Sequence, residues 1–121
     1  MESKAARARH DFANQYVIDL LGNLDREISL DQAEVIVEGV CSQYGVPPIL
    51  IRFSDRFKSC WGRAYKKTRT VSLCVKHGRS VSCLLHEIAH LLPESYNHSE
   101  KWQGTFILLV KWYIHEQNYA W

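Results

Sequence analysis

Apolar and polar side chains alternate along the chain with periods that predict helices at both ends and strands in the middle. The first helix runs from Ala5 to Leu21, where apolar residues recur at helical spacings, and Gly22 stops it. The second opens at Ser29, in a capping box with Gln32, and runs to Tyr44. The apolar positions that define these helices are Phe12, Tyr16, Val17, Leu20, Leu21 and Leu24, then Ala33, Ile36, Val37, Val40 and Tyr44.

Three short extended segments follow Gly45 and the Pro47-Pro48 pair, which end the second helix. They cover Ile49 to Phe53, Cys60 to Tyr65 and Thr70 to Lys76. The last segment alternates apolar with polar side chains, a pattern typical of a half-buried strand. Residues 66–69 would connect the second strand to the third as a turn.

Two further helices complete the predicted order. The first is capped by Ser80 and stopped by Pro93, and its leucines can pack inward. The last follows Asn97 and Glu100, a second capping pair that would place His98 in its first turn. Its apolar stripe consists of Trp102, Phe106, Leu109, Val110, Tyr113 and Ile114. The predicted fold class is α+β, with two N-terminal helices, a small three-stranded sheet, a central helix and a C-terminal helix.

Composition favours a single domain over residues 1–121. A chain of 121 residues with 46% hydrophobic content can bury a core without disulfide bonds. Its four cysteines form no C-x-x-C pair, which favours reduced and mostly buried thiols. The charged N-terminus lacks the apolar core of a secretory signal, and no apolar run reaches the roughly 20 residues of a membrane span. We therefore expect a cytoplasmic protein without a membrane partner.

The segment HEIAH on the central helix carries the main candidate chemistry. Residues four apart lie on one helical face, so His86 and His90 can direct both imidazoles at one cation, with Glu87 beside them. This spacing is the H-E-x-x-H pattern of zinc hydrolases. A hydrolytic zinc site has three protein ligands and one open position for water, so a third ligand is required.

His98 is the favoured third ligand, because the chain turns back after Pro93 and the predicted cap would hold His98 on a rigid helix. Glu94, Glu100 and Glu116 remain alternatives with a carboxylate ligand. Other residues of suitable chemistry are interpreted as ordinary packing or surface positions: Cys83, His10, His77 and His115.

A family resemblance rests on the run from Trp61-Gly62-Arg63-Ala64 through TVSLCV and SCLLHEIAHLL to NHSEKW. This run resembles the SprT-like zinc metallopeptidases and the small metallohydrolases similar to them in bacteria and phages. Ser99-Glu100 stands where that family often has Gly-Pro. The ImmA/IrrE-like regulatory peptidases also carry an H-E-x-x-H helix after a strand, and they compete for the resemblance.

The resemblance implies a zincin-like fold and a bound Zn²⁺. It also implies metal ligation by His86, His90 and His98, catalysis by Glu87, and Trp102 in the place of the aromatic residue after the third ligand.

The predicted activity is hydrolysis of a protein or peptide substrate by a zinc metallopeptidase. Glu87 would act as general base toward water and later protonate the leaving amine. Tyr96 is the nearest candidate for a second donor to the oxyanion. The alternative is a zinc-containing binding or regulatory module with little or no turnover, associated with nucleic acid or ImmA/IrrE-like.

Positive charge is concentrated between Arg52 and Arg79, where nine basic residues accompany Asp55 alone. The net charge of only +2 hides this asymmetry. The aromatic residues Phe53, Phe57, Trp61 and Tyr65 are interleaved with the basic ones, a mixture that can pair phosphates and stack bases. The segment predicts weak, salt-sensitive binding of single-stranded nucleic acid, with contacts from Lys66, Lys67 and Arg69.

Overall fold

A computed structural model of the chain describes residues 2–57, 61–93 and 98–119. Within these ranges the order of elements is the predicted one, which confirms the α+β class, with four α-helices and a three-stranded mixed sheet. The elements are α1 (Lys4–Leu21), the 3-10 helix η1 (Gly22–Leu24), α2 (Leu30–Tyr44), β1 (Leu50–Ser54), β2 (Gly62–Tyr65), β3 (Thr70–Cys74), α3 (Val81–Leu91) and α4 (Glu100–Tyr119).

Helix ends follow the local signals of the sequence. The capping box of α2 is confirmed, since the Ser29 hydroxyl accepts from the Gln32 backbone N–H at 3.1 Å and the Gln32 side chain accepts from the Ser29 backbone N–H at 2.9 Å. Gly45 ends that helix with a φ of 60°, a left-handed conformation that glycine adopts without strain. Ser80 caps α3 by accepting from the backbone N–H of Cys83, as predicted.

The start of the last helix differs from the prediction. Helix α4 begins at Glu100, and the Ser99 hydroxyl accepts from the backbone N–H of Trp102 at 3.2 Å. His98 therefore lies in the turn before the helix, and its predicted place in the first helical turn is wrong. Serine is a strong N-cap residue, so the helix starts immediately after Ser99. The predicted cap Asn97 lies outside the described residues.

The sheet has the strand order β1-β3-β2, with β1 parallel and β2 antiparallel to the central strand β3. Residues 66–69 form the predicted turn between β2 and β3. The predicted strand bounds shift by one residue in β1, and Val75 and Lys76 belong to a turn after β3. The half-buried pattern expected for β3 is wrong, because this strand has a neighbour on each side and is buried throughout.

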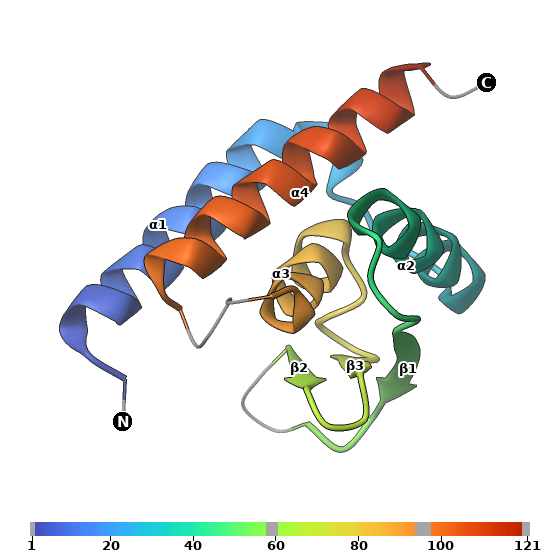
Figure 1. The fold of residues 1–121 in the computed structure, drawn as a ribbon, viewed down its shortest axis with the longest axis horizontal. Coiled ribbons are helices and arrows are strands. Elements are labelled where there is room, and N and C mark those ends of the chain that lie inside the picture. The colour runs from blue at the N-terminus through green and yellow to red at the C-terminus, as the bar shows by residue number, and fades with distance from the viewer. Residues whose placement is uncertain (1, 58–60, 94–97, 120–121) are drawn as a thin grey trace.

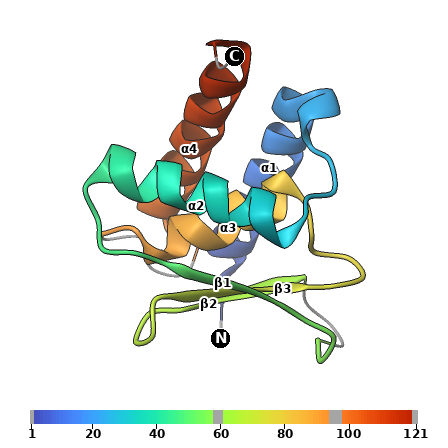
Figure 2. The same cartoon turned by 90° about the vertical axis from the view of Figure 1, so that its right-hand side faces the viewer.

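Helix α3 lies at the centre of the molecule, between the sheet and the pair formed by α1 and α4 (Figure 1). Figure 2 shows the sheet below α2 and α3, with α1 and α4 above them. Buried core residues come from the four α-helices, from β3 and from the loops, whereas β1, β2 and η1 contribute only partly buried side chains such as Ile51, Ala64 and Leu24. The largest fully buried side chains are Trp102, Phe106, Ile28, Leu73, Leu84, Leu85, Ile88, Leu109, Val17, Val40, Val71 and Val81.

The buried face of α1 is not the one that its larger apolar residues indicate. Phe12 is 58% exposed, whereas Ala13, Val17 and Leu21 are buried. Two apolar stripes run along this helix, and the one with small side chains faces the core. No helix among the described residues is long and apolar enough to cross a membrane. The described cysteines, Cys41, Cys74 and Cys83, are free thiols, as predicted.

Candidate metal site

Helix α3 places His86 and His90 one turn apart on the same face, with ring centroids 5.3 Å apart. The opposite faces of the helix are fixed by fully buried Leu84, Leu85 and Ile88. The His86 side chain is only 12% exposed, and that of Glu87 only 13%. The predicted pair and its neighbouring carboxyl group therefore lie on a rigid helix, largely out of contact with water.

His98 joins this pair from the turn before α4. Its ring centroid lies 5.4 Å from that of His86 and 5.0 Å from that of His90, so the three rings form a nearly equilateral triangle. The Nε2 atoms of His86 and His98 are 3.4 Å apart. The structure thus brings together the three histidines that the sequence analysis selected.

The second nitrogen of two of these rings is held by a side-chain oxygen. His86 Nδ1 lies 3.0 Å from Asn14 Oδ1, and His98 Nδ1 contacts the Glu2 carboxylate. These oxygens accept hydrogen bonds, so each Nδ1 carries the hydrogen and each Nε2 presents a lone pair. This is the arrangement by which ligand histidines are oriented in metal sites.

Two lone pairs therefore face each other across the 3.4 Å between His86 Nε2 and His98 Nε2. Such a contact between two acceptors is unfavourable unless a cation lies between them. Tetrahedral zinc, with Zn–N bonds of about 2.0 Å, holds its ligand nitrogens about 3.3 Å apart. The donor set and its spacing fit a bound metal ion.

A fourth histidine, which the sequence analysis set aside, lies at the same place. His10, on α1, has its ring centroid 4.3 Å from that of His98 and 5.3 Å from that of His86. Among the described residues, two groups offer ligand atoms within 4.8 Å of one another: His10 with His86 and His98, and His86 with Glu87 and His90. His90 and His98 do not belong to the same group, although their ring centroids are 5.0 Å apart.

Sequence reasoning missed His10, Asn14 and Glu2 because they come from the first helix and the residues just before it, more than 70 positions before the motif. One local signal was present: His10 and Asn14 are four residues apart and so share a helical face. That signal becomes informative only once α1 is known to lie against α3.

Trp102 forms the floor of the site. It is fully buried, and its ring centroid lies 4.9 Å from that of His86, 4.6 Å from that of His98 and 5.4 Å from that of His90. The His90 ring stacks on it at an interplanar angle of 14°. Its Nε1 donates to the His86 backbone carbonyl at 3.4 Å. The indole thus supports all three rings of the motif.

Burial controls the charge of the site. It lowers the pKa of His86 to about 2 and that of His90 to about 4, and neighbouring histidines add to both shifts. Burial also lowers the pKa of His98, although the hydrogen bond to Glu2 opposes this. The imidazoles are therefore neutral at pH 7, the form that binds metal.

The pKa of Glu87 is also shifted by burial, but upward. Burial raises the pKa of its carboxyl group to about 7, while the positive charge of Arg63 acts to lower it. A cation beside His86 would further favour the ionised form, since Glu87 Oε2 lies 3.9 Å from His86 Nε2. Its side chain packs against β2, where a Cβ added to Gly62 would lie 3.2 Å from Glu87 Cγ. Gly62 thus leaves the space that Glu87 occupies.

The remaining candidates from the sequence lie apart from this cluster or outside the described residues. Tyr96 and Glu94 are not among the described residues. Glu100 and Glu116 are exposed and belong to neither group of ligand atoms. Cys83 packs against the core, and burial raises the pKa of its thiol, which disfavours the thiolate that binds metal.

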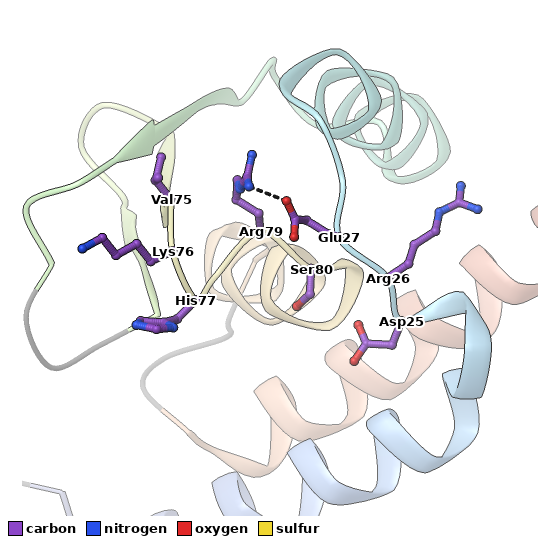
Figure 3. Close-up of a pocket in the computed structure, with 8 residues that line it drawn as sticks. All are labelled: Asp25, Arg26, Glu27, Val75, Lys76, His77, Arg79 and Ser80. Atoms are coloured by element: carbon purple, nitrogen blue, oxygen red, sulfur yellow. Dashed lines mark hydrogen bonds and ion pairs between the residues drawn. The ribbon is translucent and has the colours of Figure 1, made fainter.

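A hollow lies near the start of α3 (Figure 3), and none of the motif histidines lines it. Arg79 and Glu27 form an ion pair within it, and His77 contributes to its wall. The lining residues are Asp25, Arg26, Glu27, Val75, Lys76, His77, Arg79 and Ser80.

The basic segment lies on the sheet and its turns. Arg69 has a φ of 47° and donates to the backbone carbonyls of Pro47 and Pro48, at 3.0 and 3.3 Å, so its guanidinium holds the fold. Of the interleaved aromatics, Trp61 is 59% exposed and Tyr65 is 37% exposed.

No family model matches this sequence, and comparisons with curated proteins and with solved structures give no significant match. The structure by itself supports one conclusion about the chemistry of this site. Histidine and glutamate side chains from α1, α3 and the turn before α4 are positioned to hold a metal ion.

Proposed function

We propose that the protein is a zinc-dependent metallopeptidase with a zincin-like fold, as the resemblance to SprT-like enzymes implies. The observation that carries the proposal is the 3.4 Å approach of the Nε2 atoms of His86 and His98, beside Glu87 on an H-E-x-x-H helix. His86, His90 and His98 would hold the ion. Three imidazoles are a typical protein ligand set for catalytic zinc.

Zinc bound there would act as a Lewis acid, activating water and polarising the scissile carbonyl group. Glu87 is the general base in this proposal. Its carboxylate is held beside His86 by the helix and against β2 by packing, so its position does not depend on a flexible loop. It takes a proton from water and delivers it to the leaving amine.

The sheet offers a place for an extended substrate. Strand β2 lies at an edge of the described sheet, and Gly62 brings this strand into contact with Glu87. An extended peptide that pairs with an edge strand gains main-chain hydrogen bonds. A peptide bound along β2 would therefore pass beside the proposed general base.

Glu87→Gln tests the proposal, because the amide keeps the shape of the side chain but cannot act as a base. Glu116→Gln is the matched control, since Glu116 is exposed on α4. We expect zinc-loaded Glu87→Gln to keep its fold and metal content. It should hydrolyse fluorescently labelled casein at least about 100-fold more slowly than the parent protein. Glu116→Gln should behave like the parent.

Retained turnover in zinc-loaded Glu87→Gln would refute this role of Glu87. Equal behaviour of parent and variant, with zinc bound and no hydrolysis in either, would instead favour a zinc-containing binding or regulatory module.

A second proposed activity is weak binding of single-stranded nucleic acid by the basic segment. The observation that favours it is the exposure of Trp61 and Tyr65, because exposed aromatic rings can stack on bases. The Arg52 guanidinium lies over the Tyr65 ring, 5.8 Å from its centroid, and adds positive charge beside that surface.

A further inference from the structure

We propose that His10 is a displaceable fourth metal ligand, through which helix α1 closes the metal site. The inference rests on the proposed function, because it concerns the same ion. It adds a regulatory element that the H-E-x-x-H pattern does not contain, supplied by the first helix of the chain.

The position of His10 is the first support. One ring nitrogen of His10 lies within 4.8 Å of a ring nitrogen of His86 and of His98, in one of the two groups of possible metal ligands among the described residues. Its ring centroid lies 4.3 Å from that of His98, which is shorter than the corresponding distances from His86 and His90 to His98, 5.4 and 5.0 Å. The side chain is half-buried and lies among the other imidazoles, as a ligand must.

Helix α1 is tied to the site by several polar contacts on the same side as His10. Asn14, one turn after His10, accepts from His86 Nδ1 at 3.0 Å. Arg9 Nε donates to the His98 backbone carbonyl at 2.9 Å, and Glu2 contacts His98 Nδ1. The N-terminal segment that carries His10, from Glu2 to Asn14, therefore also orients two of the proposed ligands.

Alternative hydrogen bonds make His10 displaceable. Its Nδ1 lies 3.0 Å from Asp11 Oδ1, and its Nε2 accepts from Asn14 Nδ2 at 3.1 Å. These partners satisfy the ring when it is not bound to metal. His86, in contrast, has its Nε2 directed at His98. His10 can thus leave the metal without its own ring nitrogens becoming unpaired.

The consequence follows from coordination number. Zinc held by four imidazoles has a closed tetrahedral shell, the arrangement of structural sites, whereas catalytic sites keep one position for water. With His10 bound, the site stores zinc but has reduced access for water. Release of His10 opens the fourth position.

His10→Ala and His10→Gln test the inference on the full chain loaded with zinc. Alanine favours the helix, and glutamine can still hydrogen-bond with Asn14 and Asp11, so glutamine separates loss of the ligand from loss of these contacts. His77→Ala is the control, because His77 is exposed and lies away from the site. Circular dichroism verifies that each variant is folded.

X-ray absorption of the zinc-loaded proteins counts the imidazoles on the metal. We expect four in the parent and in His77→Ala, and three in both His10 variants. Zinc affinity, measured by competition with a chromogenic chelator, should fall about 10-fold in the His10 variants. Casein hydrolysis should rise in them.

Three imidazoles in the parent, with unchanged affinity in both His10 variants, would overturn the inference. If the parent protein in that case hydrolysed casein and Glu87→Gln abolished the hydrolysis, the proposed function would stand without the inference about His10. A parent that binds no zinc would overturn the proposed function and the inference together.

Discussion

Asn14 Oδ1 lies 3.0 Å from His86 Nδ1, so a residue of the first helix orients a proposed metal ligand 72 positions later in the chain. The contact fixes the His86 tautomer with its lone pair on Nε2. It also means that the candidate metal site depends on helices that are remote in sequence.

Asn14→Ala should therefore weaken zinc binding without abolishing it. Loss of such an orienting hydrogen bond typically costs 10- to 100-fold in metal affinity, and we expect a decrease of about 10-fold or more. Competition with a chromogenic chelator measures it. Gln15→Ala is the control, because Gln15 bonds to Asp19 on the exposed side of α1. Equal affinities in the two variants would contradict an orienting role for Asn14.

Metal removal should lower thermal stability. Ligands on α3 and in the turn before α4 would be connected through the ion, which binds the folded chain selectively. Zinc at 100 times its dissociation constant contributes about 2.7 kcal/mol, which for a domain of this size corresponds to a Tm decrease of roughly 10 °C on chelation. Melting curves before and after verified zinc removal measure the effect. Superimposable curves would exclude a ligand set shared between these segments.

Stability of the metal-free protein should fall as the pH falls below 6.5. The pKa of His86 is lowered to about 2 and that of His90 to about 4 from an ordinary value of 6.5, so the unfolded chain takes up protons that the folded chain does not. Glu87 acts in the opposite sense, because its pKa is raised to about 7 from 4.5 and the folded chain holds the extra proton.

Between pH 6 and pH 5 the two histidines together bind about two more protons in the unfolded chain than in the folded chain, whereas Glu87 binds about one fewer. The unfolded chain therefore binds about one more proton in total, so the free energy of unfolding should fall by about 1.4 kcal/mol for each pH unit that the pH falls. Glu87→Gln removes the opposing group and should make this decrease steeper. Urea denaturation of the metal-free proteins across this range tests both expectations. A free energy of unfolding that does not change with pH would show that the histidines are not buried as neutral groups.

Gly62→Ala should destabilise the protein and disturb Glu87. The added Cβ would lie 3.0 Å from Leu73 Cδ2, 3.1 Å from the Ser72 carbonyl oxygen and 3.2 Å from Glu87 Cγ. Overpacking of this kind costs about 1–3 kcal/mol. Gly104→Ala is the control, because a Cβ there meets nothing within 4 Å and alanine favours the exposed helix. Urea denaturation measures the free energy of unfolding of both variants. Equal values for Gly62→Ala and Gly104→Ala would contradict close packing of β2 on Glu87.

Single-stranded nucleic acid should bind weakly, with an affinity that falls as salt rises. Lys66→Gln with Lys67→Gln should reduce this affinity, whereas Lys101→Gln with Lys111→Gln, on α4, should not. Arg69 is left unchanged because its contacts with Pro47 and Pro48 hold the fold. Titration of labelled single-stranded DNA at low and moderate salt gives the answer. If no binding occurs at low salt, or if both pairs reduce it equally, the basic segment has no specific role.

Local signals predicted much of the fold. The capping box of Ser29 and Gln32 and the cap at Ser80 depend on residues within one helical turn, and both are confirmed. The i, i+4 spacing of His86 and His90 likewise determines where two side chains point once the helix is known.

Properties that depend on packing between distant segments could not be read from local pattern. The parallel pairing of β1 with β3 and the burial of α1 through Ala13 and Val17 follow from how the layers assemble. The same applies to His10, which reaches the site only because α1 packs beside α3 and α4.

The position of α1 has a consequence for synthesis on the ribosome. This helix is translated well before α3 and α4, the elements it packs against. The nascent chain therefore carries an amphipathic helix without its native neighbours, with Val17 and Leu21 open to chaperones until the C-terminal half emerges. The candidate metal site can therefore assemble only after α3 and the turn before α4 have been translated.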